Sequence, residues 1–132
     1  MSKKSFQYTM PPKVSVIIVN YNGKHLLSKC LESLSTINYE NLEVILVDNN
    51  STDESIEFVT KNYPSIILLK LDKNKGFAEP NNLGAKLAKG EYLLFLNNDT
   101  IHKNNWLEPL IHKLEGDEKI SSNSKTISQI QN

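Results

Sequence analysis

Four short apolar runs alternate along the chain with segments whose apolar residues recur at helical spacing. The runs are VSVIIV at 14–19, VILV at 44–47, IILL at 66–69 and YLLFL at 92–96. Each run is nearly continuous instead of alternating apolar with polar residues, which is typical of a strand buried on both faces. Because helical segments separate the runs, the pattern predicts parallel strands in an α/β three-layer sandwich with right-handed crossovers.

The segments between the runs carry signals for helix ends. Asp53 precedes a periodic segment and is expected to cap its helix, which must stop before Pro64. Gly90 is expected to end the next helix, and the last helix should end near Gly116.

A chain of 132 residues suffices for one compact domain. We expect a loose N-terminal segment at 1–11 and one α/β domain at 12–116. Residues 117–132 are polar, and they are either a tail or the start of a further strand.

The charge of the chain narrows the classes of ligand. Its 15 Lys+Arg balance 15 Asp+Glu, and this zero net charge argues against a dedicated nucleic-acid-binding protein. All of these cations are lysines. An anionic ligand must therefore be held by Lys, backbone N–H groups, a helix N-terminus or a metal, since no guanidinium is available.

The remaining composition points to a reducing compartment. The single cysteine, Cys30, lies in a helical pattern and is expected to be a small core residue. No apolar run approaches the roughly 18 residues of a membrane span, and residues 1–10 lack the apolar centre of a signal peptide. We therefore expect the protein in the cytoplasm or peripherally at the inner face of the membrane. His25, His102 and His112 flank or lie in helices and are expected at the surface.

Candidate chemistry lies where the strands end, because ligands of an open parallel sheet bind beyond the carboxyl ends of its strands. Polar residues follow every predicted strand, and Asp48 and Asp99 stand close behind two very apolar runs. The chain has no G-x-G-x-x-G, P-loop, C-x-x-C, H-E-x-x-H or G-x-S-x-G motif. These absences argue against dinucleotide, P-loop nucleotide, zinc and serine-hydrolase sites.

Three blocks together carry a resemblance to a known family. They are VSVIIVNYNG at 14–23, EVILVDNNSTDES at 43–55 and NKGFAEPNNLGAKLAKGEYLLFLNNDT at 74–100. In this order and spacing they resemble the nucleotide-sugar-binding half of family 2 glycosyltransferases with the A-type fold, in particular the rhamnosyltransferase-like branch. The resemblance covers about residues 12–120. It implies the strand order 3-2-1-4 in a Rossmann-like half of the A-type domain.

The resemblance also implies a set of site residues. The expected nucleotide-sugar contacts are Tyr21, Asp48, Lys75, Gly76, Asn82 and Asn98. Asn97-Asn98-Asp99 matches the D-x-D motif of the family, so Asp99 is the expected ligand of a divalent metal, Mg or Mn. Asn97 departs from the acidic first position of that motif, which lowers the charge offered to the cation.

The implied function is transfer of a sugar, with inversion, from a UDP- or dTDP-linked donor to an acceptor hydroxyl in cell-surface polysaccharide synthesis. The family's second half binds the saccharide or lipid-linked acceptor and supplies the catalytic base, and nothing after Asp99 resembles it. We therefore expect this chain to hold the donor-binding half, with little or no turnover of its own. The alternative is a truncated, non-catalytic nucleotide-binding module. A receiver-like signalling domain fits less well, because the first strand ends in Asn20 instead of an acidic cluster.

In the implied strand order the fourth strand, at 92–96, lies at an edge of the sheet. An uncovered apolar edge invites pairing with another chain. We expect either self-association through this edge or a tail that folds back as a fifth strand.

Overall fold

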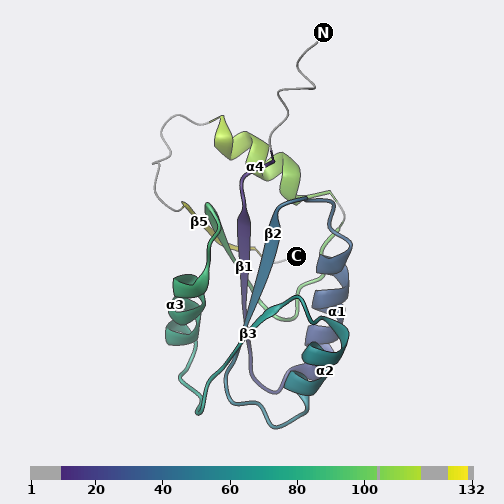
Figure 1. The fold of residues 1–132 in the computed structure, drawn as a ribbon, viewed down its shortest axis with the longest axis vertical. Coiled ribbons are helices and arrows are strands. Elements are labelled where there is room, and N and C mark those ends of the chain that lie inside the picture. The colour runs from purple at the N-terminus through teal and green to yellow at the C-terminus, as the bar shows by residue number, and fades with distance from the viewer. Residues whose placement is uncertain (1–9, 104, 117–124, 131–132) are drawn as a thin grey trace.

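The computed structural model describes residues 10–103, 105–116 and 125–130. Within them, strands and helices alternate along the chain, as Figure 1 shows. The elements are β1 (Val14–Asn20), α1 (Lys24–Ser35), β2 (Leu42–Asp48), α2 (Ser55–Asn62), β3 (Ile67–Lys70), α3 (Ala78–Leu87), β4 (Tyr92–Leu96), α4 (Leu107–Glu115) and β5 (Lys125–Ile130). None of the helices in these ranges combines the length and the apolar character that crossing a bilayer would require.

The strands form one parallel sheet in the order β3-β2-β1-β4-β5. The predicted α/β sandwich with the order 3-2-1-4 is therefore confirmed, and β5 extends it by one strand. The register matters for the site, because Asn20 pairs with Asp48 at the ends of β1 and β2. Ile18 pairs with Leu96 at the end of β4, so the residues after β4 lie beside the end of β1.

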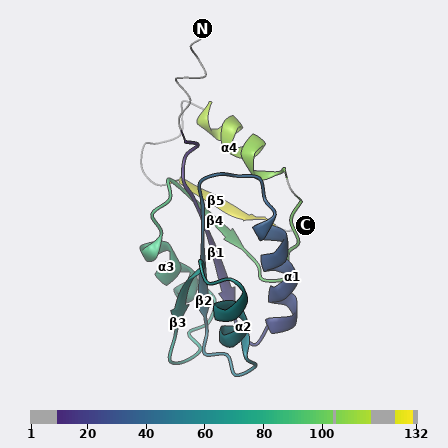
Figure 2. The same ribbon diagram turned by 45° about the vertical axis from the view of Figure 1, so that its right-hand side comes forward.

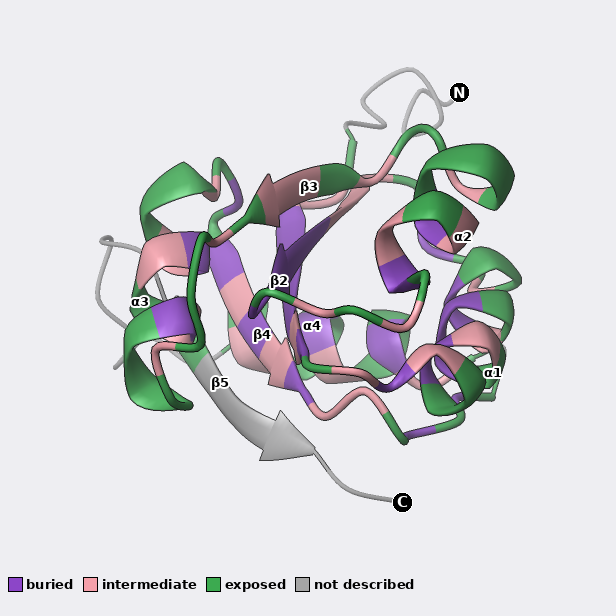
Figure 3. Ribbon diagram, turned by 90° about the horizontal axis from the view of Figure 1, so that it is seen from below, coloured by how far each residue is buried: buried purple, intermediate pink, exposed green. Residues whose placement is uncertain are grey.

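Helices cover both faces of the sheet, but unequally. The larger core lies under α1, α2 and α4, and one buried cluster joins helix residues such as Leu27, Leu31 and Leu107 with the strand residues Ile18 and Leu94. The smaller core lies under α3 on the opposite face, around Ile17, Ile45 and Val47. Figure 3 shows the buried parts of β2 and β4 between α3 on one side and α1 and α2 on the other.

Gly84 lets α3 lie close to the sheet. A Cβ atom at this position would come within 2.7 Å of Ile17 Cγ2 and 3.0 Å of Val47 Cγ2. The close approach fixes the height of α3, and with it the loop 72–77 that leads into the helix from β3.

The structure corrects the prediction that β3 is buried on both faces. Ile67 is 38% exposed and Lys70 is also exposed, since β3 is the last strand at its edge of the sheet. Edge strands have a neighbour on one side only, and charged residues such as Lys70 protect them from pairing with other chains.

At the other edge, β5 pairs with β4, with a shift in register between Leu94 and Leu96. Figure 2 shows β5, in yellow, beside β4. Of the two expected arrangements, the fifth strand is the one that the structure contains, and self-association stays a prediction. The rest of the segment 117–132 lies outside the described residues, as do residues 1–9.

At the N-terminal end, the Pro11 carbonyl accepts a hydrogen bond from the Asn41 side-chain amide, and the Pro12 carbonyl accepts one from the Tyr39 hydroxyl.

Two predicted helix ends differ from the structure. Asp53 lies two residues before α2, and its carboxylate accepts hydrogen bonds from the N–H groups of both Ser55 and Lys24, the first residues of α2 and α1. It therefore serves two helices instead of one. The helix α3 ends at Leu87, three residues before Gly90. Gly90 is needed for another reason, because a Cβ atom there would lie 2.5 Å from Ser15 Oγ.

Candidate functional site

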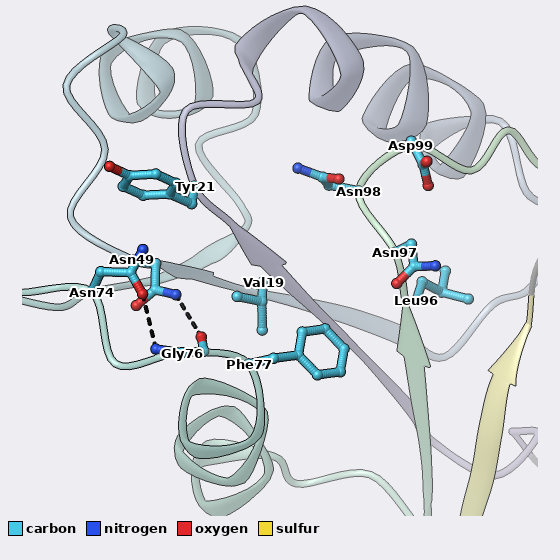
Figure 4. Close-up of a pocket in the computed structure, with 10 residues that line it drawn as sticks. All are labelled: Val19, Tyr21, Asn49, Asn74, Gly76, Phe77, Leu96, Asn97, Asn98 and Asp99. Atoms are coloured by element: carbon cyan, nitrogen blue, oxygen red, sulfur yellow. Dashed lines mark hydrogen bonds between the residues drawn. The ribbon is translucent and has the colours of Figure 1, made fainter.

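A cavity of about 510 Å³ lies at the carboxyl end of the sheet, where the sequence predicts the ligand. The loops after β1, β2, β3 and β4 all contribute to it, as Figure 4 shows. The lining residues are Val19, Tyr21, Asn49, Asn74, Gly76, Phe77, Leu96, Asn97, Asn98 and Asp99. Four predicted site residues thus face one cavity, namely Tyr21, Gly76, Asn98 and Asp99.

Two aromatic rings give this cavity an apolar surface. Tyr21 follows β1 and is 53% exposed, and Phe77 precedes α3 and is 58% exposed. Figure 4 shows Val19 between them at the end of β1. Exposed rings of this kind bind flat or apolar ligand surfaces well, since they bury large areas and have few rotatable bonds. Tyr21 is one of the predicted contact residues, whereas Phe77 belongs to the matched block at 74–100 without being among the predicted contacts.

Asn49 fixes the loop that forms the floor of the cavity. It is only 3% exposed, and its Oδ1 accepts a hydrogen bond of 2.8 Å from Lys75 N–H. Its Nδ2 donates to the Gly76 carbonyl oxygen at 2.7 Å. Gly76 has φ +83°, which favours glycine, and its N–H donates to Asn74 Oδ1. The two bonds from Asn49 therefore hold a turn that glycine adopts at low energy.

The sequence interpretation missed Asn49. Its position directly after Asp48 was the available signal, since adjacent residues at the end of a strand point in opposite directions. Only one of the two can face the cavity, and the structure places Asn49 there.

Asp48 lies beneath the cavity instead of lining it. The residue is fully buried, and its carboxylate accepts hydrogen bonds from Asn20 Nδ2 at 3.1 Å and from the Ser51 N–H and hydroxyl at 2.8 Å each. Asn20 in turn accepts a bond of 2.9 Å from Asn98 Nδ2. Asp48 is thus connected to the cavity wall through Asn20, and its expected contact with a nucleotide stays a prediction.

Asp99 is exposed and is the single carboxylate among the described residues that line the cavity. The described part of the chain has no group of three or more His, Cys, Asp or Glu residues placed to hold a metal ion. The oxygen donors of Asp99, Asn97 and Asn98 nevertheless fit a hard cation such as Mg²⁺. This ion usually binds through one or two carboxylates and completes its coordination with substrate phosphates and water.

The two remaining predicted residues do not line the cavity. Lys75 is adjacent to it, with its ammonium 3.8 Å from Glu79 Oε2 in an i,i+4 ion pair. Asn82 is exposed on α3. Asn82 lies more than one turn from the first residue of α3.

A polar cluster supports the loop 97–99 from below. The Thr100 hydroxyl donates to the Asn97 carbonyl at 2.9 Å and lies 2.8 Å from His102 Nε2. His102 stacks on Trp106 at a centroid distance of 5.1 Å, and burial lowers its pKa. His102 is 6% exposed, so the expectation of a surface histidine is wrong here.

The predicted burial of Cys30 is confirmed, and burial raises the pKa of its thiol.

The fold and the cavity define an α/β ligand-binding domain whose site is formed by loops at the carboxyl end of a parallel sheet. The model of the glycosyl transferase family 2 matches residues 15–129, which is most of the chain. The chain therefore belongs to glycosyl transferase family 2.

Curated relatives and solved structures agree with this family. The chain is 39% identical over 93 residues to the poly(ribitol-phosphate) beta-glucosyltransferase of Bacillus spizizenii, covering 66% of this chain and 15% of the relative. It is 36% identical over 103 residues to the UDP-Glc:alpha-D-GlcNAc-diphosphoundecaprenol beta-1,3-glucosyltransferase WfaP of Escherichia coli, covering 77% and 41%. The structure of S. aureus TarS in complex with UDP matches with a TM-score of 0.73 and 29% identity, covering 78% and 32%. The chain thus spans less than half the length of each of these relatives.

Proposed function

We propose that this chain is the donor-binding part of an inverting glycosyltransferase that uses a UDP-linked sugar in cell-surface polysaccharide synthesis. The observation that carries the proposal is the cavity at the strand ends, which combines exposed aromatic rings with amide and carboxylate oxygens. Relatives named as glucosyltransferases, one of them with UDP-Glc in its name, support it. The similar TarS chain has been solved with UDP. A dTDP-linked sugar is the second donor to test, and the cytoplasm or the inner face of the membrane is the proposed location.

We assign each part of the donor to a different side of the cavity. We assign the base to the apolar side of the cavity, near Tyr21, with the Asn49 side chain at the edge of the base or ribose. The sugar then lies toward Phe77, and the diphosphate lies toward Asn98 and Asp99. A bound Mg²⁺ or Mn²⁺, held by Asp99, would neutralise charge on the departing nucleoside diphosphate. Lys75, in the loop that lines the cavity, is the cationic side chain that we assign to the same charge, given that the chain has no arginine.

The reaction itself needs a group that removes the proton from the acceptor hydroxyl. Among the described residues lining the cavity, Asp99 is the only carboxylate, and we assign it to the cation. The base and the acceptor-binding surface are therefore proposed to come from outside these residues. This favours, as a second candidate, a chain that binds the nucleotide sugar without transferring the sugar.

Calorimetric titration with UDP and dTDP, with and without Mn²⁺, tests the proposal. We expect binding that is stronger with the cation, and Asp99→Ala should lose that gain while keeping the cation-independent affinity. Product analysis with UDP-glucose and a saccharide acceptor separates the two candidates. Absence of binding to either nucleotide under all conditions would refute the proposed donor site. Full metal-dependent affinity in Asp99→Ala would refute the role of Asp99 alone.

A further inference from the structure

The buried carboxylate of Asp48 begins a chain of hydrogen bonds whose direction is fixed. A carboxylate can only accept, so the atom of Asn20 that contacts Asp48 must be the amide nitrogen. The second hydrogen on Asn20 Nδ2 points to Ser51 Oγ at 3.3 Å. The Ser51 hydroxyl donates to Asp48 Oδ1 and accepts from Asn22 N–H at 2.8 Å. The two atoms that contact Asn20 Nδ2, Asp48 Oδ1 and Ser51 Oγ, therefore both require a hydrogen-bond donor at that position.

The orientation of Asn20 determines the orientation of Asn98. With its nitrogen toward Asp48, Asn20 presents Oδ1 to Asn98, and an oxygen there requires a donor in return. Asn98 supplies Nδ2 at 2.9 Å. The Asn98 Oδ1 is then left for the cavity, and within the described part of the chain it forms no hydrogen bond. Figure 4 shows the Asn98 amide in the cavity wall near Asp99.

Gly23 leaves the space in which the two amides meet. A Cβ atom on Gly23 would lie 2.5 Å from Asn98 Nδ2 and 2.8 Å from Asn20 Oδ1. Asn20 is fully buried, so water has little access to replace either bond. The contact between β1 and the loop after β4 is thus a direct and enclosed pair of amides.

We propose that Asp48 and Asn20 are positioning residues that set the polarity of Asn98, so that it offers an oxygen and not an N–H to the donor nucleotide. This inference rests on the proposed function for the identity of the ligand. An amide oxygen at that position accepts a hydrogen bond from a ribose hydroxyl, or contributes to the shell of a cation beside Asp99. Asp48 thereby determines, through Asn20, which atom of Asn98 faces the ligand, although Asp48 itself does not contact the ligand.

The same hydrogen bonds can also run in the opposite direction if the carboxylate is moved from position 48 to position 98. In the double variant Asp48→Asn/Asn98→Asp, Asn20 can turn over and donate to the carboxylate introduced at position 98. The amide introduced at position 48 then donates to Asn20, and the carboxylate at position 98 still presents an oxygen to the cavity. In Asn98→Asp alone, both neighbours of Asn20 are carboxylates. One of these carboxylates must then face Asn20 Oδ1, and two acceptors cannot form a hydrogen bond. In Asp48→Asn alone, nothing fixes the direction, and Asn98 is free to present N–H to the ligand.

The experiment is a double-mutant cycle over Asp48→Asn, Asn98→Asp and the double variant, with two readouts. In thermal unfolding without nucleotide, Asn98→Asp should lower the midpoint by about 5 °C, and Asp48→Asn then restores most of that loss. In calorimetry with UDP, Asp48→Asn should bind about tenfold more weakly, because only this variant lets position 98 present N–H. Asn98→Asp and the double variant both present a carboxylate oxygen and should bind within a few fold of the parent chain. The control is Asn38→Asp/Asp72→Asn, which moves a charge between exposed side chains and should change neither readout.

Additive effects in the unfolding cycle would overturn the proposal, since independent sites do not rescue each other. Rescue of stability with no UDP binding by the parent chain would leave the orientation intact and refute the proposed function instead. If a single variant does not fold, NMR of the parent chain decides. The Asn98 Nδ2 proton that points to Asn20 Oδ1 should be protected from exchange both with and without UDP, and rapid exchange of both Nδ2 protons would contradict the proposed polarity.

Discussion

The Asp53 carboxylate joins the first residues of two helices that are far apart in the sequence. Its Oδ2 accepts from Lys24 N–H at 2.9 Å, and its Oδ1 accepts from Ser55 N–H at 3.0 Å as well as from the Ser55 hydroxyl. The first N–H groups of a helix have no partner within the helix, and a negative charge there is favourable. Asp53 meets both requirements for α1 and α2, and so holds the loop after β1 against the loop after β2.

We predict that Asp53→Ala lowers the free energy of unfolding by about 2 kcal/mol, the upper end for loss of a helix cap. The loss should exceed that of an ordinary cap because N–H groups of two helices lose their acceptor. Urea denaturation measures it, with Glu57→Ala on the exposed face of α2 as the control. An effect no larger than that of the control would show that water replaces the carboxylate at both helices.

The same carboxylate should make stability depend on pH. Partial burial acts to raise the pKa of Asp53, but hydrogen bonds from the Ser55 hydroxyl and from the Lys24 and Ser55 N–H groups outweigh it and hold the pKa below its usual value. A lowered pKa in the folded state contributes stability that is present above the unfolded pKa of about 3.9 and is lost as the pH falls through the folded pKa.

The parent chain should therefore lose more stability than Asp53→Asn as the pH falls below about 3.9. Denaturation midpoints for both proteins at several pH values between neutral and acidic measure the difference. We expect the difference to be largest at neutral pH and to shrink in acid. A constant difference over the whole range would show that the charge of Asp53 contributes nothing.

Gly76 allows a separate test of the cavity floor. Its φ of +83° is unfavourable for residues with a Cβ, although the space around it is open. Gly76→Ala should destabilise the loop by about 1 kcal/mol and weaken UDP binding, while Gly76→Asn should be milder because asparagine tolerates this region. Gly116→Ala is the matched control, because Gly116 has φ −81° and ordinary space for a Cβ. Equal effects at both glycines would show that backbone conformation at Gly76 is not what matters.

Much of the fold follows from the pattern of apolar residues. Continuous runs identified the strands, and the order of the sheet came with the family resemblance. The pattern could not reveal that β3 is partly exposed, since exposure depends on which strand lies at the edge. The burial of His102 was equally hidden, because it depends on Trp106 and on Thr100, which are brought together by the loop after β4.

Four of the predicted site residues line one cavity at the carboxyl end of the sheet, and their contacts with a donor stay a prediction. The sequence could not distinguish Asp48 from Asn49, because that depends on which side chain faces outward at the end of β2. The hydrogen bonds that satisfy Asp48 come from Asn20 and Ser51, and the sequence does not show that these residues meet.

The last prediction concerns Asn49 as the residue that holds the cavity floor. Asn49→Ala removes the acceptor for Lys75 N–H and the donor for the Gly76 carbonyl, two bonds of 2.8 and 2.7 Å. Net contributions of about 1 kcal/mol each imply that exchange of the Lys75 amide hydrogen speeds up by about tenfold or more. UDP affinity should fall as well, because the loop must then be ordered by the ligand.

Asn49→Asp separates the two bonds, since a carboxylate still accepts from Lys75 N–H but cannot donate to the Gly76 carbonyl. We expect an intermediate rise in the exchange rate for this variant. Asn50→Asp is the control, because Asn50 is exposed at φ 69° beside it and aspartate tolerates that backbone conformation. If Asn49→Ala leaves the exchange of Lys75 unchanged while UDP binding is lost, Asn49 acts by touching the nucleotide, and the loop keeps its conformation without it.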